Sequence, residues 1–263
     1  MIAQDRGLVL RVIPLRETSV IASLLCRTHG KVRLVARGVR APRSRAGASL
    51  ESGNEVEVVF DLRSGRDLGN LREAVLVRPW VGGLDRLEPM AVAWAAIEIL
   101  ERVLPDGAPE DGLLDASWCY FAALHSTSDR AGALLLFYAF ELQLLERLGH
   151  FPALASCRIC GNEPVGGGVI DPQDGSLACK DCGGSRRGLC LEPEVLRLLL
   201  QMQSTPWEVA MVATSPETRR QAGRVLHQLL SYHLEKYRGP LALGLLKKVD
   251  NEKDISGADS EVE

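Results

Sequence analysis

The chain has 263 residues, of which 46% are hydrophobic and 25% are charged, and its formal net charge is -3. This is the composition of a globular protein with room for two domains or one large one. No signal-peptide run is apparent at the N-terminus, and the longest apolar stretches meet a charge well before 18 residues, so we expect a cytoplasmic protein without a membrane segment. The seven cysteines fit a reducing compartment, because a chain of this length can bury a core without disulfides.

Charge is distributed unevenly along the chain. Residues 1–50 contain ten Lys or Arg and two acids, a local net of +8. Residues 81–156 contain four cations and eleven acids, a local net of -7. This asymmetry indicates a basic N-terminal unit followed by an acidic one, and a basic unit is suited to a polyanionic partner that the overall charge does not reveal.

The first 80 residues read as short strands. In "EVEVVF", Val56 and Val58 alternate with Glu55 and Glu57, which is the period of a half-buried strand. Five such segments follow one another with no helix-length pattern between most of them, and the residues from 39 to 53 read as a loop. We therefore predict an N-terminal, DNA-binding OB-fold β-barrel over residues 1–80. The predicted strands are residues 7–15, 19–27, 30–38, 54–63 and 71–79.

The basic charge is concentrated in "GKVRLVARGVRAPRSRAG", residues 30–47. On a strand, Lys31 and Arg33 would share the solvent face, and the later arginines would continue into the loop. An OB-fold tracks a nucleic-acid backbone at such a strand and loop. The predicted nucleic-acid-binding residues are Lys31, Arg33, Arg37, Arg40, Arg43 and Arg45.

Aromatic residues are scarce in this half of the chain. Phe60 and Trp80 are the only ones in residues 1–80. Stacking of bases on aromatic rings contributes ~1–3 kcal/mol per base in single-strand-binding OB-folds, so little of it is available here. We expect sequence-tolerant binding dominated by phosphate contacts and strongly dependent on salt.

The remainder of the chain has helical periodicity, so we expect a multidomain α+β protein. We predict a C-terminal α-helical domain over residues 81–156 and 183–249, with a Ser215-Pro216 start signal for its last helix. Residues 250–263 contain six acids, one Lys and almost no bulky apolar residue, so we expect a disordered acidic tail.

Four cysteines form the most specific local motif. "CRIC" and "CKDC" have the spacing Cys-x2-Cys-x18-Cys-x2-Cys, which is typical of a zinc ribbon. Four thiolates complete a tetrahedron around Zn²⁺ and leave no open position, so one structural zinc is expected in an insertion at residues 157–182, with a redox dithiol pair as the alternative. The predicted ligands are Cys157, Cys160, Cys179 and Cys182.

No motif of an active site is evident. The histidines are scattered, and the chain has no phosphate-binding glycine loop and no Gly-x-Ser-x-Gly elbow. Asp171 and Asp174 in "DPQD" read as a turn of the ribbon, although they leave a metal-dependent DNA-processing enzyme as a minor alternative. We therefore predict a binding protein and no enzyme.

Several stretches resemble the RecO family of bacterial recombination mediators. They are "GLVL" at residues 7–10, "PLRETS" at 14–19 and "HGKVRLVARGVRAPRS" at 29–44. "FELQLLERLGHFPAL" before the first cysteine pair is similar to the helix that leads into that family's zinc module. The resemblance extends to about Lys248 and implies an N-terminal OB-fold and an α-helical domain with an inserted four-cysteine zinc ribbon.

The resemblance also implies a function. RecO-like proteins bind single- and double-stranded DNA, anneal complementary strands and act with RecR to load RecA onto strands coated by the single-strand-binding protein (SSB). By position, Lys31, Arg33, Arg37, Arg40 and Arg43 match the family's basic motif, and the four cysteines match its zinc ligands. The expected partners are DNA, RecR, the C-terminal tail of SSB and, indirectly, RecA, in the bacterial cytoplasm and at the nucleoid during repair.

Other hypotheses remain open at this stage. One is a zinc-ribbon nucleic-acid-binding regulator with no role in recombination. Another is a protein-interaction module formed by the acidic helical half. The SSB tail is acidic and apolar, so it would need an apolar pocket beside cations, and Arg219, Arg220 and Arg224 are candidates for those cations.

Overall fold

The structure is a computed structural model that describes residues 2–41, 44–62, 68–127, 129–150, 152–183 and 188–246. The predicted acidic tail and Arg43 lie outside these residues, as does the side chain of Arg45. The chain divides into two compact units. Unit 1 is Met1–Pro109 with the described residues from Pro240 on, and unit 2 is Glu110–Gly239.

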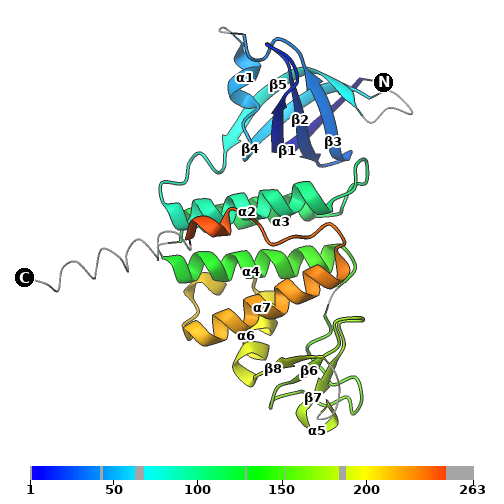
Figure 1. The fold of residues 1–263 in the computed structure, drawn as a ribbon, viewed down its shortest axis with the longest axis vertical. Coiled ribbons are helices and arrows are strands. Elements are labelled where there is room, and N and C mark those ends of the chain that lie inside the picture. The colour runs from blue at the N-terminus through cyan, green and yellow to red at the C-terminus, as the bar shows by residue number, and fades with distance from the viewer. Residues whose placement is uncertain are drawn as a thin grey trace, which may run out of the picture. The chain divides into compact units, whose positions relative to one another are not determined.

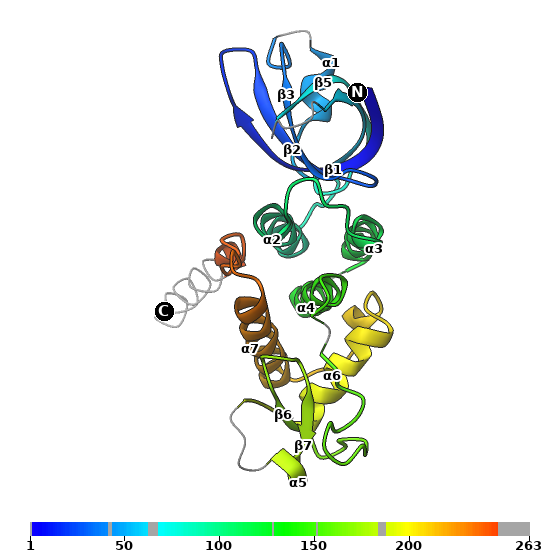
Figure 2. The ribbon, with the colours of Figure 1, turned by 90° about the vertical axis from the view of Figure 1, so that its right-hand side faces the viewer.

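Unit 1 contains the predicted five-stranded barrel. Its strands are β1 (Ile2–Pro14), β2 (Val20–Cys26), β3 (Gly30–Ala36), β4 (Asn54–Asp61) and β5 (Gly69–Pro79). The strands close in the order β1-β2-β3-β5-β4, and the closing pair, β3 with β5, is parallel while the others are antiparallel. Figure 2 shows this ring of strands nearly end-on. The OB-fold prediction is confirmed.

The barrel interior is aliphatic and includes one aromatic ring. Val56, Val58 and Phe60 are fully buried on alternate positions of β4, as the sequence pattern predicts. Glu55 departs from that pattern because its side chain is also buried. Its carboxylate accepts hydrogen bonds from Arg6 Nε at 2.6 Å and from Trp80 Nε1 at 2.8 Å, and these donors offset the cost of removing a charge from water.

Two helices of unit 1 accompany the barrel. The segment expected to be a loop contains a short helix, α1 (Arg45–Ser49), which lies at one end of the barrel (Figure 1). Helix α2 (Leu87–Val103) contacts β1 and belongs to the same compact unit as the barrel. The domain limits proposed from the sequence stay a prediction.

Unit 2 contains the other long helices. They are α3 (Leu113–His125), α4 (Arg130–Arg147), α6 (Pro193–Ser204) and α7 (Pro216–His233), with a short 3-10 helix, η1 (Val209–Met211). The side chains of Asp129 and Ser215 cap α4 and α7 by accepting hydrogen bonds from backbone N–H groups of the first turn. Helix α4 packs against α6 and α7, so helices from both sides of the cysteine region join in one core.

The cysteine region is the predicted ribbon. It consists of β6 (Gly168–Ile170), β7 (Leu177–Cys179), α5 (Lys180–Gly183) and β8 (Leu189–Leu191), and the sheet order is β7-β6-β8. Figure 1 shows it inserted between α4 and α6. None of the helices in the described ranges combines the length and the apolar character needed to cross a bilayer.

One carboxyl group lies in the core of unit 2. Glu141 of α4 is buried, and the hydroxyl of Tyr237 donates a hydrogen bond to its Oε1 at 3.0 Å. The same hydroxyl lies 3.2 Å from Nδ1 of His227. Burial disfavours the ionised carboxylate and raises the pKa of Glu141 to about 8, although the bond from Tyr237 acts in the opposite direction.

Glu141 therefore makes stability depend on pH. The pKa of Glu141 in the folded protein lies above its ordinary value, so the folded state binds the proton more tightly than the unfolded chain does. The resulting contribution of Glu141 to the free energy of unfolding is full below about pH 4.5 and is lost as pH rises toward 8. We expect Glu141→Gln, which keeps an acceptor for Tyr237, to increase the free energy of unfolding by about 3 kcal/mol at pH 7 and to flatten its pH dependence. Urea unfolding from pH 5 to 8 measures this. Glu146→Gln, an exposed change on the same helix, should follow the wild-type curve.

Candidate nucleic-acid interface and metal centre

Lys31 lies inside unit 1 and not on the solvent face. Only 8% of the residue is exposed, and its Nζ donates to the carbonyl oxygen of Glu101 at 2.8 Å and pairs with Asp106 Oδ1 at 3.4 Å. The expectation that Lys31 and Arg33 share an exposed face is wrong for Lys31, because the end of α2 and the residues after it cover this part of β3. Lys31 as a DNA-binding residue stays a prediction.

Arg33 contacts the same acidic residue. Its Nε lies 2.9 Å from Asp106 Oδ2, and its side chain is 41% exposed. On the neighbouring strand, the hydroxyl of Ser23 donates to Glu101 Oε2 at 2.6 Å. Carboxylates thus reduce the positive potential on the β2–β3 face, which in OB-folds commonly binds oligonucleotides.

Arg37 and Arg40 are the predicted binding residues that the structure leaves open to solvent. Both are exposed in the segment after β3, and neither forms an ion pair with any residue in the described ranges. The backbone N–H of Arg40 donates to the carbonyl oxygen of Thr18 at 3.1 Å, so this segment is tied to the β1–β2 loop.

The sequence reasoning missed two further cations, Arg11 and Arg16. Both are exposed, and neither pairs with an acid among the residues that the structure describes. Antiparallel pairing brings Val20 opposite Ala36, which places the β1–β2 loop and its Arg16 at the same end of the barrel as Arg37. The +8 charge of residues 1–50 was the available signal, but only the register locates Arg16.

Both aromatic rings of the barrel are enclosed. Phe60 is fully buried and packs edge-to-face against His29 at 5.3 Å, while Trp80 is 6% exposed and donates to Glu55. Neither ring is therefore presented to a base for stacking, which agrees with the expectation of phosphate-dominated contacts.

The four cysteines come together as predicted. The sulfurs of Cys157, Cys160, Cys179 and Cys182 all lie within 4.8 Å of one another, and the Cys160 and Cys179 sulfurs are 3.9 Å apart. A tetrahedral metal with bonds of about 2.3 Å to sulfur requires sulfur–sulfur distances near 3.8 Å. The donor set and its spacing therefore fit one metal ion.

The electrostatics of the cluster also favour a cation. Backbone N–H groups of Cys160, Cys179 and Ile159 lower the pKa of Cys157 to about 6, whereas hydrogen bonds and charge from the neighbouring cysteines raise the pKa of Cys182 to about 12. Four thiolates this close repel one another unless a positive ion lies between them, and a coordinated thiol is deprotonated outright. The arrangement is suited to a closed structural site.

The two aspartates of "DPQD" serve the ribbon turn. Asp171 Oδ1 accepts from the N–H of Gln173 and Asp174 Oδ1 from that of Ser176, both at 2.9 Å. Arg158 also pairs with Asp174 at 2.8 Å. Both carboxylates are thus used in local structure, and among the described residues the cysteines form the one cluster arranged for a metal.

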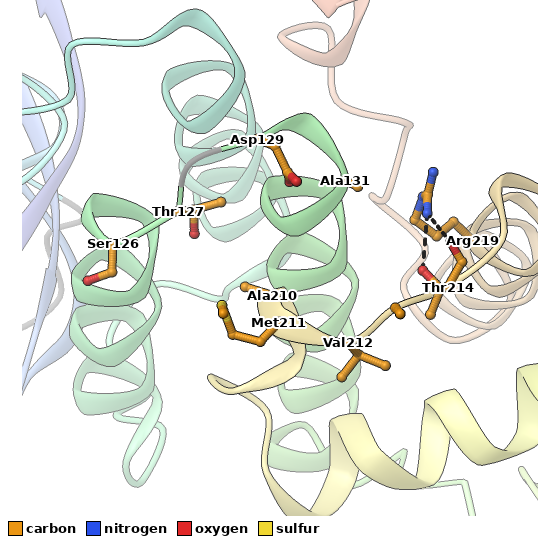
Figure 3. Close-up of a pocket in the computed structure, with 10 residues that line it drawn as sticks. Ser126, Thr127, Asp129, Ala131, Ala210, Met211, Val212, Thr214 and Arg219 are labelled. Carbon is orange, nitrogen blue, oxygen red and sulfur yellow. Dashed lines mark hydrogen bonds between the residues drawn. The ribbon is translucent and has the colours of Figure 1, made fainter.

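A cavity of about 350 Å³ lies in unit 2 beside Arg219. Its lining comes from the ends of α3 and α4, from η1 and the residues after it, and from the start of α7 (Figure 3). Met211 is 90% exposed at this site, Arg219 donates to Thr214 Oγ1 at 3.1 Å, and Asp129 adds one carboxylate. Arg220 and Arg224, also predicted as candidate cations, do not line the cavity and pair with Glu217.

These features define the class of the protein as an OB-fold barrel with a basic loop end, combined with a helical unit that carries a cluster of four cysteines suited to hold a metal ion. Two family models match the chain, "Recombination protein O N terminal" over residues 1–80 and "Recombination protein O C terminal" over residues 84–241. The chain belongs to the RecO family.

Similar proteins support this assignment. A protein named DNA repair protein RecO from Anaeromyxobacter dehalogenans (strain 2CP-C) is 34% identical over 236 residues, which cover 89% of this chain and 90% of that protein. One of the same name from Geobacter metallireducens is 32% identical over 253 residues, covering 94% and 98%.

The metal site leads to a test. We expect the purified protein to contain one divalent metal ion per chain, and Cys182→Ser to lower this content at least tenfold because three thiolates hold the ion less tightly. Metal analysis and thermal unfolding measure the effect. Cys190→Ser, an exposed cysteine outside the cluster, is the control and should keep the ion; a wild-type protein without metal after gentle purification would contradict the assignment.

Proposed function

We propose that this protein is a recombination mediator in DNA repair. It binds single- and double-stranded DNA through phosphates, anneals complementary strands and, with RecR, helps to load RecA onto SSB-coated single strands in the bacterial cytoplasm. The single observation that carries the proposal is a set of exposed arginines, Arg37 and Arg40 above all, at the loop end of an OB-fold in a RecO-family chain, and within the described ranges none of them pairs with an acid.

Phosphate contacts suit annealing for a physical reason. A protein that grips the backbone leaves the base edges accessible to a complementary strand, whereas extensive stacking would occupy the bases. Because Phe60 and Trp80 are enclosed, neither ring is available to stack on the bases, which supports binding through phosphates. Within the predicted basic motif, we assign direct phosphate contact to Arg37, Arg40 and the half-exposed Arg33, and assign Lys31 to holding β3 against α2.

We assign the metal as a structural Zn²⁺, one per chain. Zinc is the ion best matched to four thiolates in a tetrahedron, and the absence of an open ligand position gives it no route to catalysis. Its role is to hold the ribbon between α4 and α6. We propose, from the family resemblance, that the protein acts by binding and not by enzymatic turnover.

The C-terminal tail of SSB is assigned to the cavity beside Arg219. An acidic and apolar tail is matched by the exposed Met211, by Val212 and by the guanidinium of Arg219 in one site. Asp129 at the rim already caps α4 through Gly132 N at 2.7 Å, so its charge is partly offset.

The arginines at the loop end can be tested directly. We expect the double change Arg37→Ala and Arg40→Ala to weaken binding of single and double strands by about tenfold at low salt, and to reduce the salt slope for a single strand by roughly 1.4 if each contacts one phosphate. Fluorescence anisotropy across a range of salt concentrations measures both. Arg72→Ala, which removes an arginine paired with Asp61, should have a much smaller effect. Unchanged binding by the double variant would contradict the assignment.

Annealing tests the mediator role and separates it from that of a nucleic-acid-binding regulator. We expect the protein to anneal SSB-coated complementary strands rapidly, with further stimulation of RecA loading by RecR. Met211→Asp, which adds a negative charge to the proposed tail site, should slow annealing of SSB-coated strands about tenfold and leave bare strands unaffected.

The matched control is Val165→Asp, which adds the same charge at an exposed ribbon residue and should change neither rate. A protein that binds DNA but does not accelerate annealing would favour the regulator. Equal slowing of annealing for bare and SSB-coated strands by Met211→Asp would contradict the assignment of the SSB tail to this cavity.

A further inference from the structure

A second cavity, of about 240 Å³, lies at the basic end of the barrel. It is formed by the ends of the β1–β2 hairpin, the segment after β3 and the region of α1. Among the described residues that line it there is no Asp or Glu. The principal lining residues are Val12, Pro14, Val20, Val39, Arg40 and Leu50.

The walls of this cavity are aliphatic and firmly held. Val20, Val39 and Leu50 are each at most 8% exposed and belong to the barrel core. Gly47 lets α1 lie close to the backbone of the segment after β3, because a Cβ at position 47 would lie 2.5 Å from the carbonyl oxygen of Val39. A tightly packed wall of this kind keeps its shape when no ligand is bound.

The volume is sufficient for a planar ring. An apolar cavity of about 150 Å³ in another protein accommodates benzene, so about 240 Å³ has room for a larger ring system. Enzymes that extrude a base from its stack hold it between aromatic or simple apolar side chains, so aliphatic walls are chemically suitable for the faces of a base.

The position of Arg40 identifies the kind of ligand. Its side chain lines the cavity and is exposed, and it forms no ion pair with a residue in the described ranges. Arg37 and Arg16 lie in the segments that border the same end of the barrel. A nucleotide combines an uncharged flat base with an anionic phosphate, and this site combines aliphatic walls with the guanidinium group of Arg40, which pairs with no acid in the described part of the chain.

We propose that this cavity receives one unpaired base of single-stranded DNA while Arg40 contacts the adjoining phosphate. The inference rests on the proposed function, since it refines how the same barrel end binds DNA. A base in a duplex is paired and stacked and does not enter. Phosphate contacts therefore serve both forms of DNA, and the cavity adds affinity for the single strand alone.

The test compares three DNA probes of equal length: a single strand with bases, a single strand of abasic sites and a duplex. We expect the wild-type protein to bind the strand with bases about five- to tenfold more tightly than the abasic strand, because burial of a base adds affinity that phosphates do not. Val12→Phe, which fills the mouth of the cavity, should abolish this difference and leave affinity for the abasic strand and the duplex unchanged.

The matched control is Val75→Phe, the same change at a 50% exposed position of β5 that does not line the cavity. It should behave as the wild type. The comparison of the two single strands with wild-type protein stands by itself if Val12→Phe does not fold.

The outcomes separate this inference from the function on which it rests. Equal binding of the two single strands by the wild type overturns the base site and leaves DNA binding intact. Failure to bind any of the three probes contradicts the proposed function itself. If Val12→Phe leaves DNA binding unchanged but weakens the binding of an acidic C-terminal peptide to the protein, the cavity is a peptide site and the proposal is overturned.

Discussion

Closure of the barrel is the constraint on which the basic end depends. β3 pairs with β5 in parallel over only Leu34↔Gly69 and Val35↔Asn70 before the strands diverge. This short pairing completes the ring, and the antiparallel register of β2 and β3 then brings the β1–β2 loop beside the segment after β3. Arg16 and Arg37, which are distant in sequence, thereby come to lie at one end of the barrel, where Arg40 lines the aliphatic cavity.

Ion pairs within unit 1 determine which of its cations remain available to an anionic ligand. Asp106 contacts both Lys31 and Arg33, and the end of α2 supplies a carbonyl oxygen for Lys31. Two neighbouring positive charges of β3 are therefore compensated within the fold, whereas Arg37 and Arg40 pair with no acid among the residues that the structure describes. Because exposed charges act over about one Debye length, the arginines at the loop end are the ones whose charge an anionic ligand would meet first.

The cysteine site stabilises by a different mechanism. The ribbon has three strands of three residues each, which bury too little apolar surface to fold alone. The four cysteine sulfurs lie close enough to hold one metal ion, and such an ion would replace the missing core and offset the repulsion of the thiolates. The helices before and after the ribbon pack together, so the chain leaves and rejoins one helical core around this insertion.

The sequence by itself determined the five strands of the barrel, the helical character of the later part of the chain and the cysteine motif. Short apolar segments separated by turn residues identified the five strands, and the spacing of the cysteines identified which four come together, because both are short-range patterns. Tertiary structure decided that Lys31 and Glu55 are buried, that a short helix occupies the expected loop and that Arg16 joins the basic end. Burial and pairing of a charge depend on residues far away in the chain, such as Asp106 for Lys31 and Trp80 for Glu55, and no local pattern carries that information.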